Sequence, residues 1–223
     1  MRVEYPRRPE SLLLKIALVV PLLAASFAAS GALAETTSAS GSRTTTLVVF
    51  AAHPIPEGEW TSLLDSMRRG AALAAQQTPQ LRGPFEVLRG EMIPRGLYVD
   101  IPISVYLQGN CTLVPRPFTI ARGTLGWVPL VQGRIEPFIH IECERLVDML
   151  APMSVGMTQN RRNQVMGEAI TRVILHEWIH IATQNPRHAK RGVEKSGFNL
   201  MDLLADDEET QRRAMHDRRR KKG

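Results

Sequence analysis

Two histidines and one glutamate in this chain have the types and spacing of a metal-dependent hydrolytic site. The segment 174–181 reads ILHEWIHI, so His176, Glu177 and His180 form the pattern HExxH. Residues four apart lie on one face of a helix, which lets His176 and His180 present two imidazoles to one zinc ion. Glu177, one step around the helix, is placed to accept a proton from a zinc-bound water. These are the ligands and the base of a zinc peptidase.

The sequence around this motif favours the zinc interpretation over coincidence. A pattern of two His and one Glu at fixed places arises by chance in about 1% of chains of this length. Here, apolar residues recur at near-helical spacing from 168 to 184. One histidine in such a helix is commonly a core residue, but two at i and i+4 with a glutamate after the first match a metal site.

A third protein ligand is required, because catalytic zinc typically takes three and leaves one position for water. His188 follows His180 by eight residues and is the predicted third ligand. An Asn–Pro pair lies between them, and proline disfavours helix in the residue before it. We therefore expect the helix to end near Gln184 and the chain to turn back toward the metal. Glu194 and Asp202 are alternative oxygen ligands within reach of a returning loop.

The elements that must position these residues follow from the periodicity of apolar side chains. Strands are predicted at 44–52, 84–92, 101–109, 123–131 and 134–142, and helices at 59–77, 144–150 and from about 160 onward. The Gln132–Gly133 pair predicts a hairpin between the last two strands. This order indicates an α+β fold, with a mixed sheet of about five strands packed on helices that include the long HExxH helix. Residues 123–130 are the predicted edge strand for a peptide substrate, with Trp127 either a cleft wall or a core side chain.

The N-terminus has the features of a secretory signal peptide. Four basic residues precede an apolar run at 16–29, and residues 32–34 form an Ala-Leu-Ala cleavage site. The run is shorter than the ~20 residues of a membrane-spanning helix. We expect cleavage near Ala34, a disordered leader at 35–43, one catalytic domain at 44–205, and a location in the periplasm or outside the cell.

The two cysteines agree with export. Cys111 and Cys143 are the only pair in the chain. In an oxidising compartment they would form a disulfide that stabilises the fold by ~3 kcal/mol, whereas in the cytosol they would be free core thiols. The signal peptide favours the disulfide.

The basic character of the chain is local. The net charge is +6, and residues 212–223 alone hold seven basic residues and one acidic residue. This charged tail, 206–223, is expected to be a solvated end with weak contact to anionic membrane surfaces. Export and the lack of interleaved aromatic residues argue against nucleic acid as a partner. We expect a monomer that acts on a peptide or protein.

The sequence from HEWIH to IATQNPRH resembles a lengthened metzincin signature. In metzincins, a helix bearing HExxH turns at a glycine and a third histidine completes the zinc site. Here the third histidine comes eight residues after the second rather than six, and Thr183 stands at the glycine position. The resemblance makes Met201 the candidate for the methionine that these families place beneath the zinc.

A second resemblance covers the chain from about 44 to 198. Its landmarks are Gly109-Asn110-Cys111, Leu125-Gly126-Trp127, Pro137-Phe138-Ile139 leading to Cys143, His176 to His188, and Gly192-Val193. This layout is similar to that of a group of short exported bacterial proteins classed as metallopeptidases. The resemblance implies a zincin-like fold and peptidase activity, and it names no substrate.

Three functions are compatible with these features. The first is an exported zinc peptidase, in which Glu177 passes a proton from the zinc-bound water to the leaving amine. The second is an exported binding or assembly protein that keeps a zincin fold without catalysis; Glu177 argues against it, because a structural metal site needs no base. The third is a zinc amidase that acts on a non-peptide amide, such as a cell-wall crosslink.

Overall fold

A five-stranded sheet covered by two long helices forms the described part of the chain, which a computed structural model defines over residues 43–117, 123–188 and 197–204. The predicted signal peptide, nearly all of the leader, the charged tail and the alternative ligand Glu194 lie outside these residues. The α+β class predicted from the sequence is confirmed, and so is the mixed five-stranded sheet.

The main sheet combines four parallel strands with one antiparallel edge strand. Its order is β2-β1-β3-β7-β4. The parallel strands are β1 (Thr45–Ala51), β2 (Phe85–Arg89), β3 (Ile101–Gln108) and β7 (Phe138–Glu142). The antiparallel strand β4 (Gly126–Trp127) pairs with β7 through Gly126 opposite Ile141 and Trp127 opposite His140. β4 therefore forms one edge of this sheet.

Two of the predicted strands are each divided into two short pieces. The segment 123–131 holds β4 and β5 (Leu130–Val131), and the segment 134–142 holds β6 (Arg134–Ile135) and β7. A proline, Pro129 or Pro137, lies at each division and has no N–H to donate to a continuous ladder. The predicted hairpin is confirmed, because β5 and β6 pair as a separate two-stranded sheet around Gln132–Gly133.

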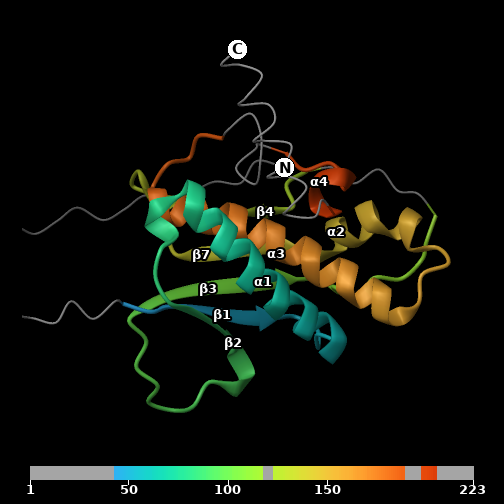
Figure 1. The fold of residues 1–223 in the computed structure, drawn as a ribbon, viewed down its shortest axis with the longest axis horizontal. Helices are drawn as coiled ribbons and strands as arrows, with labels where there is room; N and C mark the ends of the chain where they lie inside the picture. The colour runs from blue at the N-terminus through green and yellow to red at the C-terminus, as the bar shows by residue number, and fades with distance from the viewer. Residues whose placement is uncertain (1–42, 118–122, 189–196, 205–223) are drawn as a thin grey trace, which may run out of the picture. The chain divides into compact units, whose positions relative to one another are not determined.

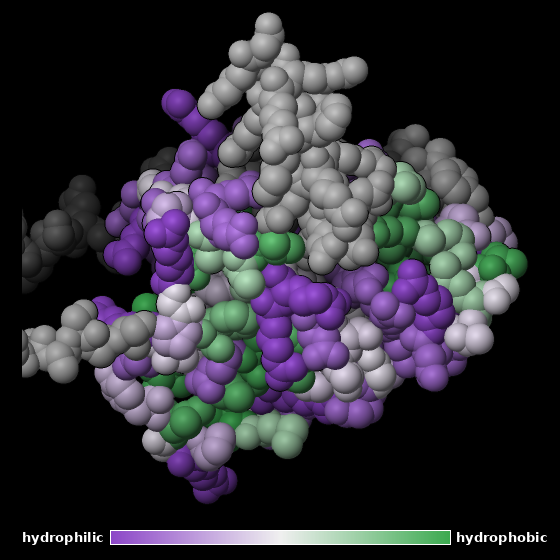
Figure 2. Space-filling view, viewed as in Figure 1, coloured by the Kyte–Doolittle hydropathy of each residue, from purple (hydrophilic) through white to green (hydrophobic). Residues whose placement is uncertain are grey.

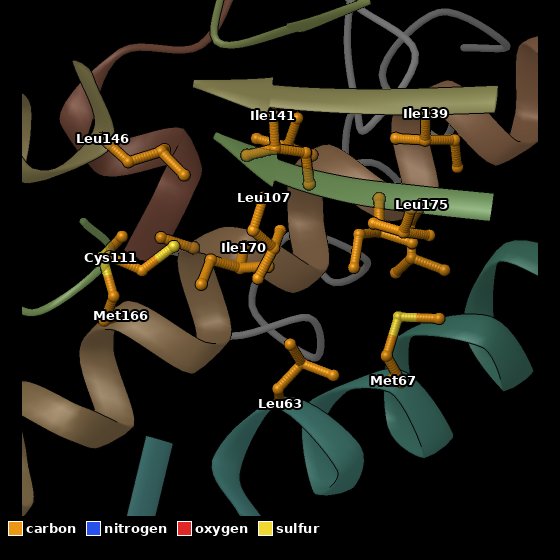
Figure 3. Packing of buried hydrophobic residues seen from close by; sticks show 14 of the residues in the cluster. Leu63, Met67, Leu107, Cys111, Ile139, Ile141, Leu146, Met166, Ile170 and Leu175 are labelled. Carbon is orange, nitrogen blue, oxygen red and sulfur yellow. The ribbon is translucent and has the colours of Figure 1, made fainter. Parts of the chain in front are cut away.

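The helices pack on the apolar face of the main sheet. In Figure 1, α1 (Glu57–Gln77) and α3 (Gln159–Thr183) lie side by side in front of the strands. Shorter helices are α2 (Cys143–Leu150) and α4 (Leu200–Leu204), with 3-10 turns η1 (Pro79–Leu81), η2 (Gly90–Met92) and η3 (Ala151–Ser154). The strand side chains facing the helices are at most 2% exposed: Leu47, Val49, Ile103, Val105, Leu107, Ile139 and Ile141. Figure 3 shows several of them meeting Leu63 and Met67 of α1 and Ile170 of α3.

Close contact between the two long helices fixes where α3 lies. A Cβ on Gly167 would stand only 2.7 Å from both the Glu59 carbonyl oxygen and the Leu63 nitrogen of α1. One turn further along α3, Thr171 Oγ1 donates to the Leu63 carbonyl oxygen at 3.2 Å. A glycine and a buried hydroxyl thus bring the backbones of the two helices together at this point.

The opposite face of the sheet carries a column of stacked rings. Phe50, Tyr106, His140 and Trp127 come from four neighbouring strands, and their successive centroids lie 5.4, 5.2 and 4.9 Å apart with nearly parallel planes. Each contact joins residues directly opposite in the strand register. The Trp127 ring is the end of this column, so β4 is attached to the sheet by stacking as well as by backbone pairing.

The predicted disulfide is present. Cys111, after β3, is bonded to Cys143, the first residue of α2, with a Cα separation of 4.7 Å. Both residues are buried. Such a bond is compatible with an exported protein.

The surface of the described part is mixed in character. Figure 2 shows hydrophobic side chains over the connection between β2 and β3, where Met92 is 70% and Leu97 is 42% exposed. None of the described helices combines the length and the apolarity needed to cross a bilayer.

Candidate metal centre

The HExxH motif lies in the last two turns of α3. The helix begins after Thr158, whose hydroxyl accepts a hydrogen bond from the Arg161 N–H at 3.3 Å. From 169 to 180 every residue is buried, because α3 packs on the sheet and on α1 along most of its length. The motif residues His176, Glu177 and His180 are therefore only 5, 6 and 5% exposed.

Three imidazoles converge at this end of the helix. Ring nitrogens of His176, His180 and His188 all lie within 4.8 Å of one another. The Nε2 atoms of His176 and His180 are 3.1 Å apart. Two nitrogens that share one tetrahedral zinc at ~2.05 Å stand about 3.3 Å apart, so this pair matches such a site closely. The three predicted ligands are thus brought together, and the donor set suits a divalent transition metal.

The loop after the helix orients His180. Its Nδ1 lies 2.6 Å from the carbonyl oxygen of Asn185. Because a carbonyl oxygen only accepts hydrogen bonds, Nδ1 must carry the proton and the neutral ring then presents the lone pair of Nε2 toward His176. A second bond, from Arg187 N–H to Asn185 Oδ1 at 3.1 Å, closes the turn that leads to His188.

Burial changes the pKa of two groups in the centre. It raises the pKa of the Glu177 carboxyl to about 7. Desolvation, followed by the nearby His180, lowers the pKa of the His188 imidazole. His188 is therefore neutral near pH 7, which is the form that binds a metal.

A cavity of about 720 Å³ opens beside the three histidines. Its wall is mostly apolar and includes Leu125, Val128, Leu130, Ile135, Met149, Pro152, Val173 and Leu200. Apart from the three histidines, Glu177 is the only ionisable residue among the described lining residues. The cavity is thus a mostly apolar space that the three histidines and Glu177 border.

The edge strand β4 lies directly over the Glu177 carboxylate. A Cβ on Gly126 would stand 2.5 Å from Val173 Cγ1, 3.0 Å from the His140 carbonyl oxygen and 3.4 Å from Glu177 Oε1. Since side chains alternate along a strand, Trp127 points to the other face, where its ring stacks on His140. Trp127 borders the cavity, but its ring belongs to the stacked column.

The methionine suggested by the metzincin resemblance is not beneath the histidines. Met201 lies in α4 and is 67% exposed. Phe198 makes the contact instead, with its ring centroid 5.3 Å from that of His176. Asp202, the described alternative ligand, accepts a hydrogen bond from Asn199 N–H at 2.7 Å. Among the described residues, the three histidines form the one group with the donor spacing of a metal site.

Two residues at this centre had no assigned role from the sequence. Gly126 was part of a recognised segment, but only the fold shows that α3 passes beneath it. Gln184 ends α3 and bonds to Ile135, which is 49 residues away in the chain. The isolated glycine in a predicted strand was a local signal of close backbone approach. No local signal indicated the Gln184 contact.

Comparison with models of protein families finds no match, and neither do comparisons with curated proteins or with solved structures.

Proposed function

We propose that this protein is an exported zinc-dependent peptidase with a zincin-like fold. The observation that carries the proposal is the convergence of three imidazoles, with a buried glutamate beside them, on the wall of a mostly apolar cavity. The order of strand, helix, further strands and motif-bearing helix is the order that the metallopeptidase resemblance implies. The disulfide is consistent with an oxidising compartment.

The proposed ligands are His176, His180 and His188. Zinc bound there would supply a Lewis acid that polarises the scissile carbonyl and brings the pKa of a bound water to about 7. Glu177, whose Oε1 lies 4.0 Å from His176 Nε2, would accept the proton of that water and deliver it to the departing amine nitrogen. One carboxylate can serve both steps because its burial keeps bulk water from competing for the proton.

The cavity and the edge strand indicate how a peptide would bind. The described lining residues contribute no Asp, Lys or Arg side chain. A large apolar side chain next to the scissile bond would lose no hydrogen bond on entry, and the burial of its apolar surface would favour binding. The peptide backbone could pair with β4, the edge strand over Glu177, as an added antiparallel strand.

The test is metal analysis and peptide cleavage by the purified protein and by Glu177→Gln. We expect one zinc per chain in both, with cleavage of a mixed peptide library only by the wild type and mostly beside apolar residues. Glu168→Gln is the matched control, because Glu168 lies on the same helix and accepts a hydrogen bond from Gln164 instead. Absence of bound zinc in the wild type would refute the proposal. Zinc without Glu177-dependent cleavage of peptides would favour a binding protein or an amidase.

A further inference from the structure

The last residue of the motif helix has an unusual backbone conformation. Gln184, the C-cap of α3, has φ 52° and ψ 29°, in the left-handed region. Glycine is the common residue at such a helix end, because a side chain there costs roughly 1–2 kcal/mol. Gln132 at the hairpin tip is the only other non-glycine residue with positive φ in the described part of the chain. Something must hold Gln184 in this conformation.

The side-chain amide of Gln184 pairs with β6 as a further strand would. Its Oε1 accepts from the Ile135 N–H at 3.0 Å, and its Nε2 donates to the Ile135 carbonyl oxygen, also at 3.0 Å. The same Nε2 lies 2.9 Å from the carbonyl oxygen of Ile181, in the last turn of α3. Three hydrogen bonds, each with a net contribution of roughly 0.5–1.5 kcal/mol, offset the cost of the conformation.

The Ile135 backbone is available for this contact because the hairpin uses its neighbours. β6 pairs with β5 through Arg134 opposite Val131, and next to this pair Glu136 N–H donates to the Pro129 carbonyl oxygen at 2.9 Å. Ile135 itself is 3% exposed, so its N–H and C=O need partners inside the protein. Gln184 supplies both partners, and these bonds attach the end of α3 to the hairpin.

The direction in which the chain leaves α3 decides the geometry of two ligands. Directly after Gln184, the Asn185 carbonyl oxygen meets His180 Nδ1 at 2.6 Å. Three residues later, His188 brings its ring nitrogen within 4.8 Å of those of His176 and His180. A different conformation at Gln184 would move both the carbonyl and His188 away from the centre.

We propose that Gln184 is a positioning residue of the metal centre. Its amide bond pair with Ile135 fixes the exit of the chain from α3, and this fixes the tautomer of His180 and the return of His188. The inference rests on the proposed metal centre and adds to it how a helix without the usual glycine completes the ligand set.

Two substitutions separate the amide contacts from the backbone conformation. Gln184→Met keeps the size of the side chain and removes all three hydrogen bonds. Gln184→Gly also removes them but relieves the left-handed strain, so it folds even where the methionine variant is unstable. Gln132→Met is the matched control, because Gln132 is an exposed glutamine with the same φ of 52° at the tip of the same hairpin.

The primary measurement is zinc affinity, determined by competition with a chromophoric chelator. We expect both Gln184 variants to bind zinc about 10–100-fold more weakly, the usual effect of losing a residue that orients a ligand. The visible spectrum of the Co²⁺ form should lose intensity as tetrahedral geometry is lost. Gln132→Met should match the wild type. If Gln184→Gly binds zinc as tightly as the wild type, the proposal is overturned, because the turn would then position the ligands without the amide contacts.

A measurement on the metal-free protein separates this inference from the proposed function. The ¹⁵N resonances of the His180 ring report which nitrogen carries the proton. We expect the Nδ1–H form in the wild type and in Gln132→Met, and a mixture of tautomers in both Gln184 variants. If the wild type binds no zinc, the proposed function fails, and these spectra still decide the role of Gln184. An unchanged His180 tautomer in Gln184→Gly would refute the positioning role.

Discussion

Each half of α3 lies at a buried carboxyl group, and the two carboxyl groups have different surroundings. At the crossing with α1, Glu59 is fully buried, and neither of its carboxylate oxygens has a hydrogen-bond partner among the described residues. In the last turns, Glu177 is 6% exposed but borders the cavity and lies 4.0 Å from a histidine nitrogen. One glutamate is enclosed by packing, and the other faces a space that a second molecule can enter.

This difference shows that burial alone does not identify a functional carboxyl group. Desolvation raises the pKa of Glu59 to about 8 and that of Glu177 to about 7. The two groups are distinguished by their surroundings, because of the two only Glu177 borders the described cavity and lies beside the histidines of the candidate metal centre. Glu59 is expected to affect stability, and Glu177 to affect chemistry.

A large effect on stability at a fixed pH should come from zinc itself. A ligand that binds only the folded state at 1,000 times its dissociation constant stabilises it by about 4 kcal/mol. In urea unfolding, we expect the free energy of unfolding to be higher by this amount with zinc than with a chelator, in the wild type and in Glu59→Gln. His176→Ala should lose most of it. An equal gain in His176→Ala would place the zinc site away from α3.

The next effect is the dependence of stability on pH. Glu59 keeps its proton in the folded state up to about pH 8 but releases it near 4.5 when unfolded. The unfolded state therefore binds fewer protons between these values, and stability falls as pH rises by about 1.4 kcal/mol per unit. We expect this slope to be smaller by that amount in Glu59→Gln, measured by urea unfolding with a chelator present. Identical slopes would mean that Glu59 titrates normally.

A methyl group added between α1 and α3 should reduce the stability of the fold without changing peptide cleavage. In Gly167→Ala the added methyl group meets backbone atoms of Glu59 and Leu63 at 2.7 Å, which cannot rotate away. We expect a loss of about 3 kcal/mol, in the upper part of the range for overpacking. Gly197→Ala should be neutral in the same unfolding measurement, because no atom of the described residues lies within 4 Å of its new Cβ. A neutral Gly167→Ala would show that the helices adjust freely.

A methyl group beside Glu177 should have the reverse effect, which is to reduce peptide cleavage rather than stability. Gly126→Ala would push β4 away from Val173 and from the carboxylate of Glu177. We expect kcat/KM for a cleaved peptide to fall about tenfold, as small displacements in an active site commonly do. Zinc content should stay the same. Loss of zinc together with activity would indicate that β4 supports the ligands rather than the base.

The sequence was sufficient to predict most of the elements and the convergence of the three histidines. Helical spacing placed His176 and His180 on one face of the helix, and the proline after Asn185 correctly indicated that the chain turns back there. Both are local rules that act within a few residues. Pro129 and Pro137 were local signals as well, and they explain why two of the predicted strands are interrupted.

The rest depends on contacts between distant parts of the chain. Glu59 stands in the first turn of an amphipathic helix, where an acidic residue is usually exposed and favourable. Here it is fully buried where α1 packs against α3, with its backbone carbonyl oxygen next to Gly167. Likewise, a glutamine side chain that pairs with a backbone 49 residues away has no counterpart in local periodicity. Such contacts follow from the packed fold and cannot be inferred from spacing.

The disulfide has a consequence for how the protein is made. Cys143 is completely buried and Cys111 is 6% exposed, so an oxidant has little access to the two sulfur atoms once the core has closed. The bond therefore forms most readily while the chain is still folding, provided that the surroundings are oxidising. We expect protein that folds in a reducing cytoplasm to lack this bond, and to form it in air only as slowly as the core opens locally.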